Sequence, residues 1–169
     1  GASVLDGART LELARTTTDA DGAWSVTHDG YEAVAIEVIG GTTAEASGGE
    51  VSLDGGAVLQ AVALELAIGE QRAGIVVSPA THLVASLGRA RWQAGKEATF
   101  NLAVARAHER MAAHLGFDPI RTPVAAVAAA AGSPTDSVKY GLVLAGLSEL
   151  AALAAADQGV TVQSVNTVE

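Results

Sequence analysis

The pattern of apolar and polar positions changes character at Ser78-Pro79. Before this point, apolar residues alternate with polar ones in short runs that end at glycine, which is typical of half-buried β-strands. After it, apolar residues recur every three or four positions in alanine-rich segments, which is typical of amphipathic helices. The pattern therefore predicts two domains, a β domain over residues 1–78 and a helical domain over residues 79–169.

The β half is predicted to hold several short antiparallel strands. Glu37 is expected to face outward, 42–49 to form a polar loop, and Arg72–Val77 to be the last strand. Strands at this spacing predict a β-sandwich of the immunoglobulin type. The inward-facing rows, in chain order, are Leu11 and Leu13; Trp24 and Val26; Val34, Ile36 and Val38; Val51 and Leu53; and the even positions of 58–68.

The helical half is predicted to be a bundle of about four helices, so the fold class is α+β. Ser78 can cap the first helix and Pro79 fits its first position. The predicted helices are 79–93, with a buried stripe of Leu83, Val84 and Leu87; 96–115, ending at Gly116; 122–132; and a last one from Ser133-Pro134, with Ser133 and Asp136 resembling a capping box. The apolar stretch 140–156 is interpreted as a buried helix, because it is short for a membrane span of about 20 residues.

The charge is concentrated in the β half. The formal net charge is −9, and residues 1–78 carry 12 acidic against 3 basic side chains. An acidic surface argues against nucleic acid as a partner, because neutralising phosphates requires Lys and Arg. The chain has no cysteine, which excludes disulfides and thiolate metal sites.

Asp19 and Asp21 are the candidate metal ligands. Calcium takes six to eight oxygens, and an EF-hand loop needs glutamate at its twelfth position, where this chain has Gly30. The favoured interpretation is a hairpin turn in which an aspartate side chain accepts bonds from nearby backbone amides. Trp92 and Tyr31 are the candidate ligand-binding residues, because an exposed aromatic ring can stack on a sugar.

No catalytic constellation is apparent. His108 and His114 lie six residues apart on one predicted helix, so they cannot face one metal together. Each histidine is interpreted as a boundary or surface residue, and Ser78 and Ser133, each followed by proline, as helix caps. The sequence therefore predicts a protein that is not an enzyme and has no cofactor.

Two segments resemble a known family. The strip T-T-T-D-A-D-G-A-W-S-V, from Thr16 to Val26, resembles the repeated turn of carboxypeptidase-regulatory-like domains, with Asp19, Gly22, Trp24 and Val26 matching. These are transthyretin-like β-sandwiches of bacterial surface and envelope proteins. The strip V-V-S-P-A-T-H-L, from Val76 to Leu83, is similar to the junction at which a helical region follows the sandwich in envelope lipoproteins.

The resemblance implies a non-enzymatic extracellular or cell-envelope module with a structural or adhesive role, and it supplies no active-site residues. Such sandwiches open with a strand before the one at Ser3–Leu5, and almost nothing precedes that strand here. Either the chain is a fragment or the strand comes from elsewhere. In the second case another chain can add a strand at the open edge, so the expected partner is a protein or a second copy of this one. The alternative is a glycan- or calcium-binding module of a larger secreted protein.

Overall fold

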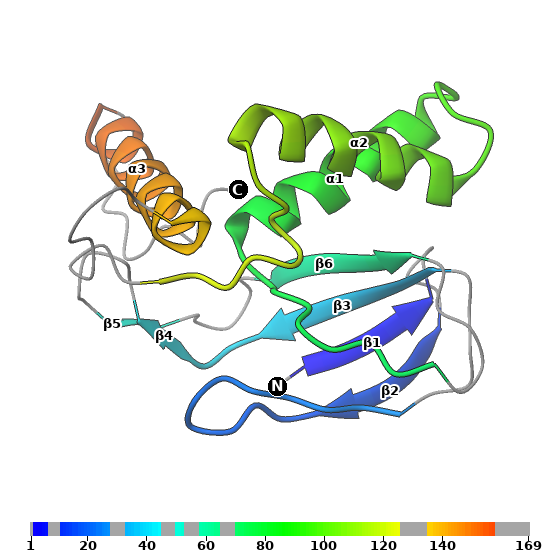
Figure 1. The fold of residues 1–169 in the computed structure, drawn as a ribbon, viewed down its shortest axis with the longest axis horizontal. Helices are drawn as coiled ribbons and strands as arrows, with labels where there is room; N and C mark the ends of the chain where they lie inside the picture. The colour runs from blue at the N-terminus through cyan, green and yellow to red at the C-terminus, as the bar shows by residue number, and fades with distance from the viewer. Residues whose placement is uncertain are drawn as a thin grey trace. The chain divides into compact units, whose positions relative to one another are not determined.

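The computed structural model describes residues 2–6, 11–27, 33–44, 50–52, 58–64, 70–125 and 135–157. By their contacts, residues 1–38 and 59–121 form one compact unit, and residues 39–58 and 122–169 form a second. The first unit holds the main sheet and two helices (Figure 1). The strands are β1 (Ala2–Asp6), β2 (Glu12–Thr16), β3 (Ala33–Ile39), β4 (Thr42–Ala44), β5 (Glu50–Ser52) and β6 (Val58–Leu64), and the helices are α1 (Pro79–Gln93), α2 (Phe100–Leu115) and α3 (Asp136–Asp157).

The predicted β-sandwich with a bundle of about four helices is wrong. The chain forms one open antiparallel sheet in the order β2-β1-β3-β6, together with the separate pair β4-β5. The described residues contain three helices. The class α+β holds at the coarse level, but no second large sheet packs on the first within the described residues.

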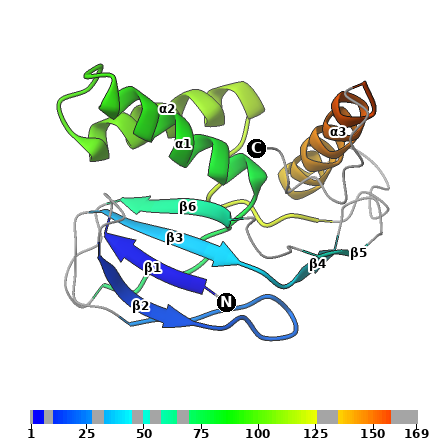
Figure 2. The ribbon, with the colours of Figure 1, turned by 180° about the vertical axis from the view of Figure 1, so that it is seen from behind.

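The main sheet is covered on both faces, which explains how one sheet supports a core. On one face, Ala33, Ala35 and Val62 pack against α1 and α2. On the other face, Val4, Val34, Ile36 and Ala63 pack against two extended segments, 24–26 and 75–77. In Figure 1 the segment 70–77 crosses the sheet on the side facing the viewer. In Figure 2, which shows the opposite side, the strands lie in front of this segment.

The two extended segments were predicted as strands, and this part of the prediction is wrong. Trp24 and Val26 do face the core while Ser25 and Thr27 are exposed. The backbone of 23–27 and 70–77 nevertheless joins no strand ladder. The amide of Val76, for example, donates to the carbonyl of Ile120 at 2.8 Å. Side-chain alternation reports which side chains are buried, and it does not report which backbone is paired.

Two exposure predictions fail for reasons in the sheet. Leu11 is 53% exposed, because the β1–β2 register shifts between Val4 and Leu5 and breaks the alternation before Leu13. Glu37 is only 5% exposed, because α1 and α2 cover its face of β3. Its carboxylate accepts a hydrogen bond of 2.9 Å from the Gln60 amide on β6, as a buried polar group requires.

The helix boundaries follow their caps. At α1, Ser78 and Thr81 form a reciprocal capping box and Pro79 takes the first position, as predicted. Helix α2 begins at Phe100 rather than Lys96, because the Thr99 side chain caps it, and it ends at Gly116 with φ +78°. Leu83 and Leu87 are exposed, and of the predicted stripe only Val84 is buried.

The second unit contains β4, β5 and α3. Strand β4 lies within the predicted polar loop, and it pairs with β5 from Thr42 opposite Ser52 to Ala44 opposite Glu50. The predicted helix 122–132 is absent over 122–125, and its remainder and the Ser133 cap lie outside the described residues. No helix in the described ranges is sufficiently long and apolar to cross a membrane.

Candidate functional site

A cleft of about 250 Å³ lies beside β6 in the first unit. Its walls come from β6, from the extended segment 70–77, from α2 and from the turn that follows α2. The apolar part of the lining includes Val62, Leu64, Ile75 and Val104, and the polar part consists of Arg72, His108, Asp118 and Arg121.

The turn after α2 carries two of the polar residues, Asp118 and Arg121. The left-handed Gly116 ends the helix, and Pro119 follows Asp118 at a position where its fixed φ suits a tight turn. The amide of Arg121 donates to the carbonyl of Asp118 at 3.3 Å, and the carbonyl of Ile120 accepts from Val76 at 2.8 Å. The turn therefore joins the end of α2 to the segment that crosses the sheet.

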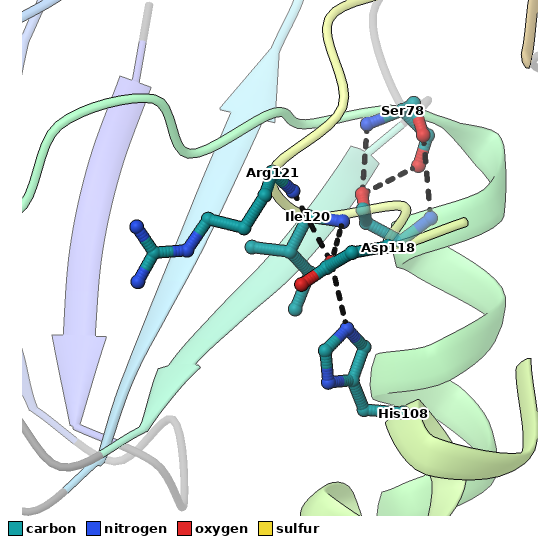
Figure 3. A network of polar contacts seen from close by, with 6 residues as sticks. Ser78, His108, Asp118, Ile120 and Arg121 are labelled. Carbon is teal, nitrogen blue, oxygen red and sulfur yellow. Dashed lines mark hydrogen bonds and ion pairs between the residues drawn. The ribbon is translucent and has the colours of Figure 1, made fainter. Parts of the chain in front are cut away.

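His108 and Asp118 form the central contact of this site (Figure 3). His108 Nε2 lies 2.9 Å from Asp118 Oδ1. The same oxygen accepts the amides of Ile120 at 2.9 Å and Arg121 at 3.2 Å. When the imidazole is protonated the His108 contact is an ion pair, and otherwise it is a neutral-donor hydrogen bond.

The surroundings of Asp118 keep it ionised. Partial burial raises the pKa of the carboxyl group, but the hydrogen bond with His108 and the amide of Ile120 outweigh this effect. The net result is a pKa below the ordinary value of 3.8. The side chain is 41% exposed, so solvent screens the interaction and its contribution to stability is small.

The two arginines of the cleft differ in their contacts. Arg72 pairs with Glu70 and donates to the carbonyl of Leu64 at the end of β6. Arg121 makes backbone contacts in the turn, and no described residue pairs with its guanidinium. Figure 3 shows this side chain extending away from His108 toward the strands. Arg121 is therefore the cation of the cleft that is available to a ligand.

The candidate metal ligands Asp19 and Asp21 lie in a tight turn, as the favoured interpretation predicted, but the turn does not form a β-hairpin, because residues 23–27 join no strand ladder. Asp19 Oδ1 accepts the amides of Asp21 and Ala23, both at 2.9 Å. Gly22 takes φ +76°, which lets the chain reverse. Among the residues that the model describes, no three His, Asp or Glu side chains gather closely enough to hold a metal ion.

Of the two candidate aromatic residues, the structure describes Trp92. Trp92 is 37% exposed near the end of α1, and its ring packs edge-on against Phe100 with a centroid distance of 5.7 Å. The Arg89 guanidinium lies over the Phe100 ring, 5.4 Å from its centroid. Tyr31 lies outside the described residues.

The sequence did not predict the cleft. His108 was interpreted as a surface residue, and neither Asp118 nor Arg121 was singled out. The one local signal was the sequence Gly116-Phe117-Asp118-Pro119, which is typical of a helix end followed by a turn. Such a signal predicts the turn, but it does not predict which helix residue the aspartate contacts.

Comparison with protein-family models, with characterised proteins and with solved structures finds no match to this chain.

Proposed function

We propose that this chain is a non-catalytic structural and adhesive module of a bacterial surface or envelope protein. The observation that carries the proposal is the turn within Thr16–Val26. Asp19 accepts two amides there, Gly22 reverses the chain, and Trp24 and Val26 then pack into the core. This local structure agrees with the turn and the aromatic-x-aliphatic pattern that the resemblance to surface modules implies. The β-sandwich that the same resemblance implies is not formed.

The use of the polar side chains supports a structural role. Asp118 joins α2 to the following turn, and Asp19 closes a tight turn. Ser78 and Thr81 cap α1 through reciprocal bonds, with Thr81 Oγ1 accepting the Ser78 amide at 2.8 Å. Hydrogen bonds of this kind each stabilise a fold by about 1 kcal/mol. Side chains of the types used in catalysis thus serve here to hold turns and helix ends.

We further propose that the module associates with a second copy along the outer edge of β2. This strand ends the sheet, and in the described part of the chain it is hydrogen-bonded to β1 alone. Such an edge presents unpaired backbone groups to an added strand. Leu11 lies immediately before β2 and is 53% exposed, so it provides apolar surface that a second copy can bury. The bulge between β1 and β2 and the exposed Glu12–Arg15 pair disfavour pairing at this edge, so we expect the association to be weak and to depend on concentration.

Light scattering on the purified chain tests this association. We expect a mass above the 16.9 kDa of one chain, and we expect Leu11→Lys to shift the population to the monomer. Leu102→Lys is the matched control, because Leu102 is a leucine of similar exposure (40%) on α2. A wild-type monomer at all concentrations, or equal effects of the two variants, contradicts association through β2.

A further inference from the structure

The cleft beside β6 combines two opposite charges with an apolar wall. The guanidinium of Arg121 has no partner among the described residues, as noted above. Asp118 uses its Oδ1 for all three of its hydrogen bonds, which leaves Oδ2 without a described partner. Both residues line the cleft. The apolar wall open to a ligand is formed by the partly exposed Leu64 and Ile75, whereas Val62 and Val104, which also line the cleft, are buried.

We propose that this cleft binds a small zwitterion, an α-amino acid with an aliphatic side chain. The ligand's carboxylate would pair with the Arg121 guanidinium, whose planar fork suits two parallel hydrogen bonds to a carboxylate. Its ammonium would contact Asp118 Oδ2. Its side chain would lie against the aliphatic wall, where burial of apolar surface adds to the affinity.

The size of the cleft sets the size of the ligand. At about 250 Å³, the cleft is smaller than the roughly 300–1,000 Å³ typical of pockets for drug-sized molecules. It suits a ligand of amino-acid size and excludes a folded partner. A larger molecule could enter only with one terminal residue, and the end of a peptide chain keeps only one of the two charges of a free amino acid.

The Asp118 anchor is held in place before a ligand arrives. The backbone amides of Ile120 and Arg121 and the His108 ring fix the orientation of the Asp118 carboxylate. Arg72, which also lines the cleft, is held by Glu70 and the Leu64 carbonyl. Preorganised groups lose less conformational entropy on binding, which favours a defined ligand orientation.

Binding is measured by ¹⁵N-correlated NMR titration of the whole chain with L-leucine at millimolar concentrations near neutral pH. We expect shifts centred on the amides of Ile120 and Arg121. N-acetyl-leucine lacks the ammonium, leucinamide lacks the carboxylate and glycine lacks the side chain, so each should bind more weakly. A leucine-terminated peptide distinguishes the two ligand sources. A peptide that carries leucine at its C-terminus keeps the carboxylate but not the ammonium, so it should bind no better than N-acetyl-leucine.

Arg121→Gln tests the anchor directly. Loss of one charge-assisted contact should weaken leucine binding roughly tenfold to hundredfold. Arg106→Gln is the matched control, because Arg106 is an exposed arginine of α2, paired with Glu109, and does not line the cleft; it should bind leucine like the wild type. Arg121 is exposed, so its substitution should leave the fold intact, and the spectrum itself reports whether it does.

Three results would overturn the proposal. The first is the absence of shifts around the cleft with leucine at saturating millimolar concentrations. The second is equal leucine affinity in Arg121→Gln and the wild type. The third is equal affinity of the wild type for leucine and N-acetyl-leucine, which would show that Asp118 does not contact the ligand's ammonium. N-acetyl-leucine tests the role of Asp118 without a substitution at this residue, because replacing Asp118 would also disturb the turn.

Discussion

Gly88 of α1 lies directly against Val104 of α2. A Cβ atom placed on Gly88 would be 2.7 Å from Val104 Cγ2 and 2.9 Å from its Cα. Val104 is fully buried and belongs to the cluster that packs the two helices onto the sheet. Only glycine allows this approach, since even a methyl group would require one helix backbone to move.

Gly88→Ala should therefore destabilise the protein. The added methyl group overpacks the helix interface, and such changes typically cost about 1–3 kcal/mol. This cost exceeds the gain of roughly 0.5–1 kcal/mol that alanine brings to a helix interior. Urea unfolding followed by circular dichroism at neutral pH measures the difference. An unchanged or higher midpoint would contradict the close approach of the two helices.

Gly146→Ala is the matched control in the same type of element. A Cβ at Gly146, within α3, meets nothing within 4 Å. Here only the intrinsic preference of alanine for helix acts, so we expect a gain of about 0.5–1 kcal/mol or no measurable change. A loss comparable to that of Gly88→Ala would show that the effect does not depend on the Val104 contact.

Asp19→Ala should destabilise the tight turn that follows β2. The substitution removes the acceptor of two amide hydrogen bonds, at a cost of about 1 kcal/mol. Asp21→Ala should change the free energy of unfolding by less than about 0.5 kcal/mol, because no described group bonds to its side chain. Thermal unfolding by calorimetry compares the two variants, and equal effects would mean that Asp19 does not organise the turn.

The contribution of Asp118 should disappear in acid. Its pKa is lowered in the folded protein, so the unfolded chain takes up the proton first as the pH falls. The ionised carboxylate therefore contributes its full stabilisation above pH 3.8, the ordinary pKa value, and loses it as the pH falls through the lowered value. Because the group is partly exposed, we expect less than about 1 kcal/mol.

Denaturant unfolding of the wild type and Asp118→Asn over a range of pH measures this dependence. The difference in unfolding free energy should shrink as the pH falls below 3.8. Asp21→Asn removes the same charge from an exposed position and serves as the reference. A difference for Asp118→Asn that grows as the pH falls below 3.8 would contradict the lowered pKa.

Local signals in the sequence predicted the local structure well. Ser78-Pro79 and Gly116 predicted the ends of α1 and α2, because caps and left-handed glycines depend on neighbouring residues. The alternation in 58–64 predicted β6, and Asp19 with Gly22 predicted the turn. The inward orientation of Trp24 and Val26 was also confirmed.

The arrangement of these elements could not be predicted in the same way. Segments 23–27 and 70–77 have the composition of strands, but they pack on the sheet without joining a ladder. The sequence does not indicate whether the backbone of such a segment pairs with a strand. Leu83 and Leu87 fit a helical stripe, yet α1 turns Val84 and Gly88 toward its neighbours. The cleft depends on contacts between distant residues, such as His108 with Asp118 and Val76 with Ile120, so no local pattern indicates it.

The location of the protein in a bacterial cell tests the proposed surface role most directly. Intact bacteria that produce the protein with an epitope tag inside this module are treated with a protease that cannot enter them. We expect the epitope to be lost from intact cells while a cytoplasmic marker survives, because a surface module is accessible from outside. An epitope that is degraded only after the whole envelope has been broken, together with the cytoplasmic marker, would contradict a surface or envelope role.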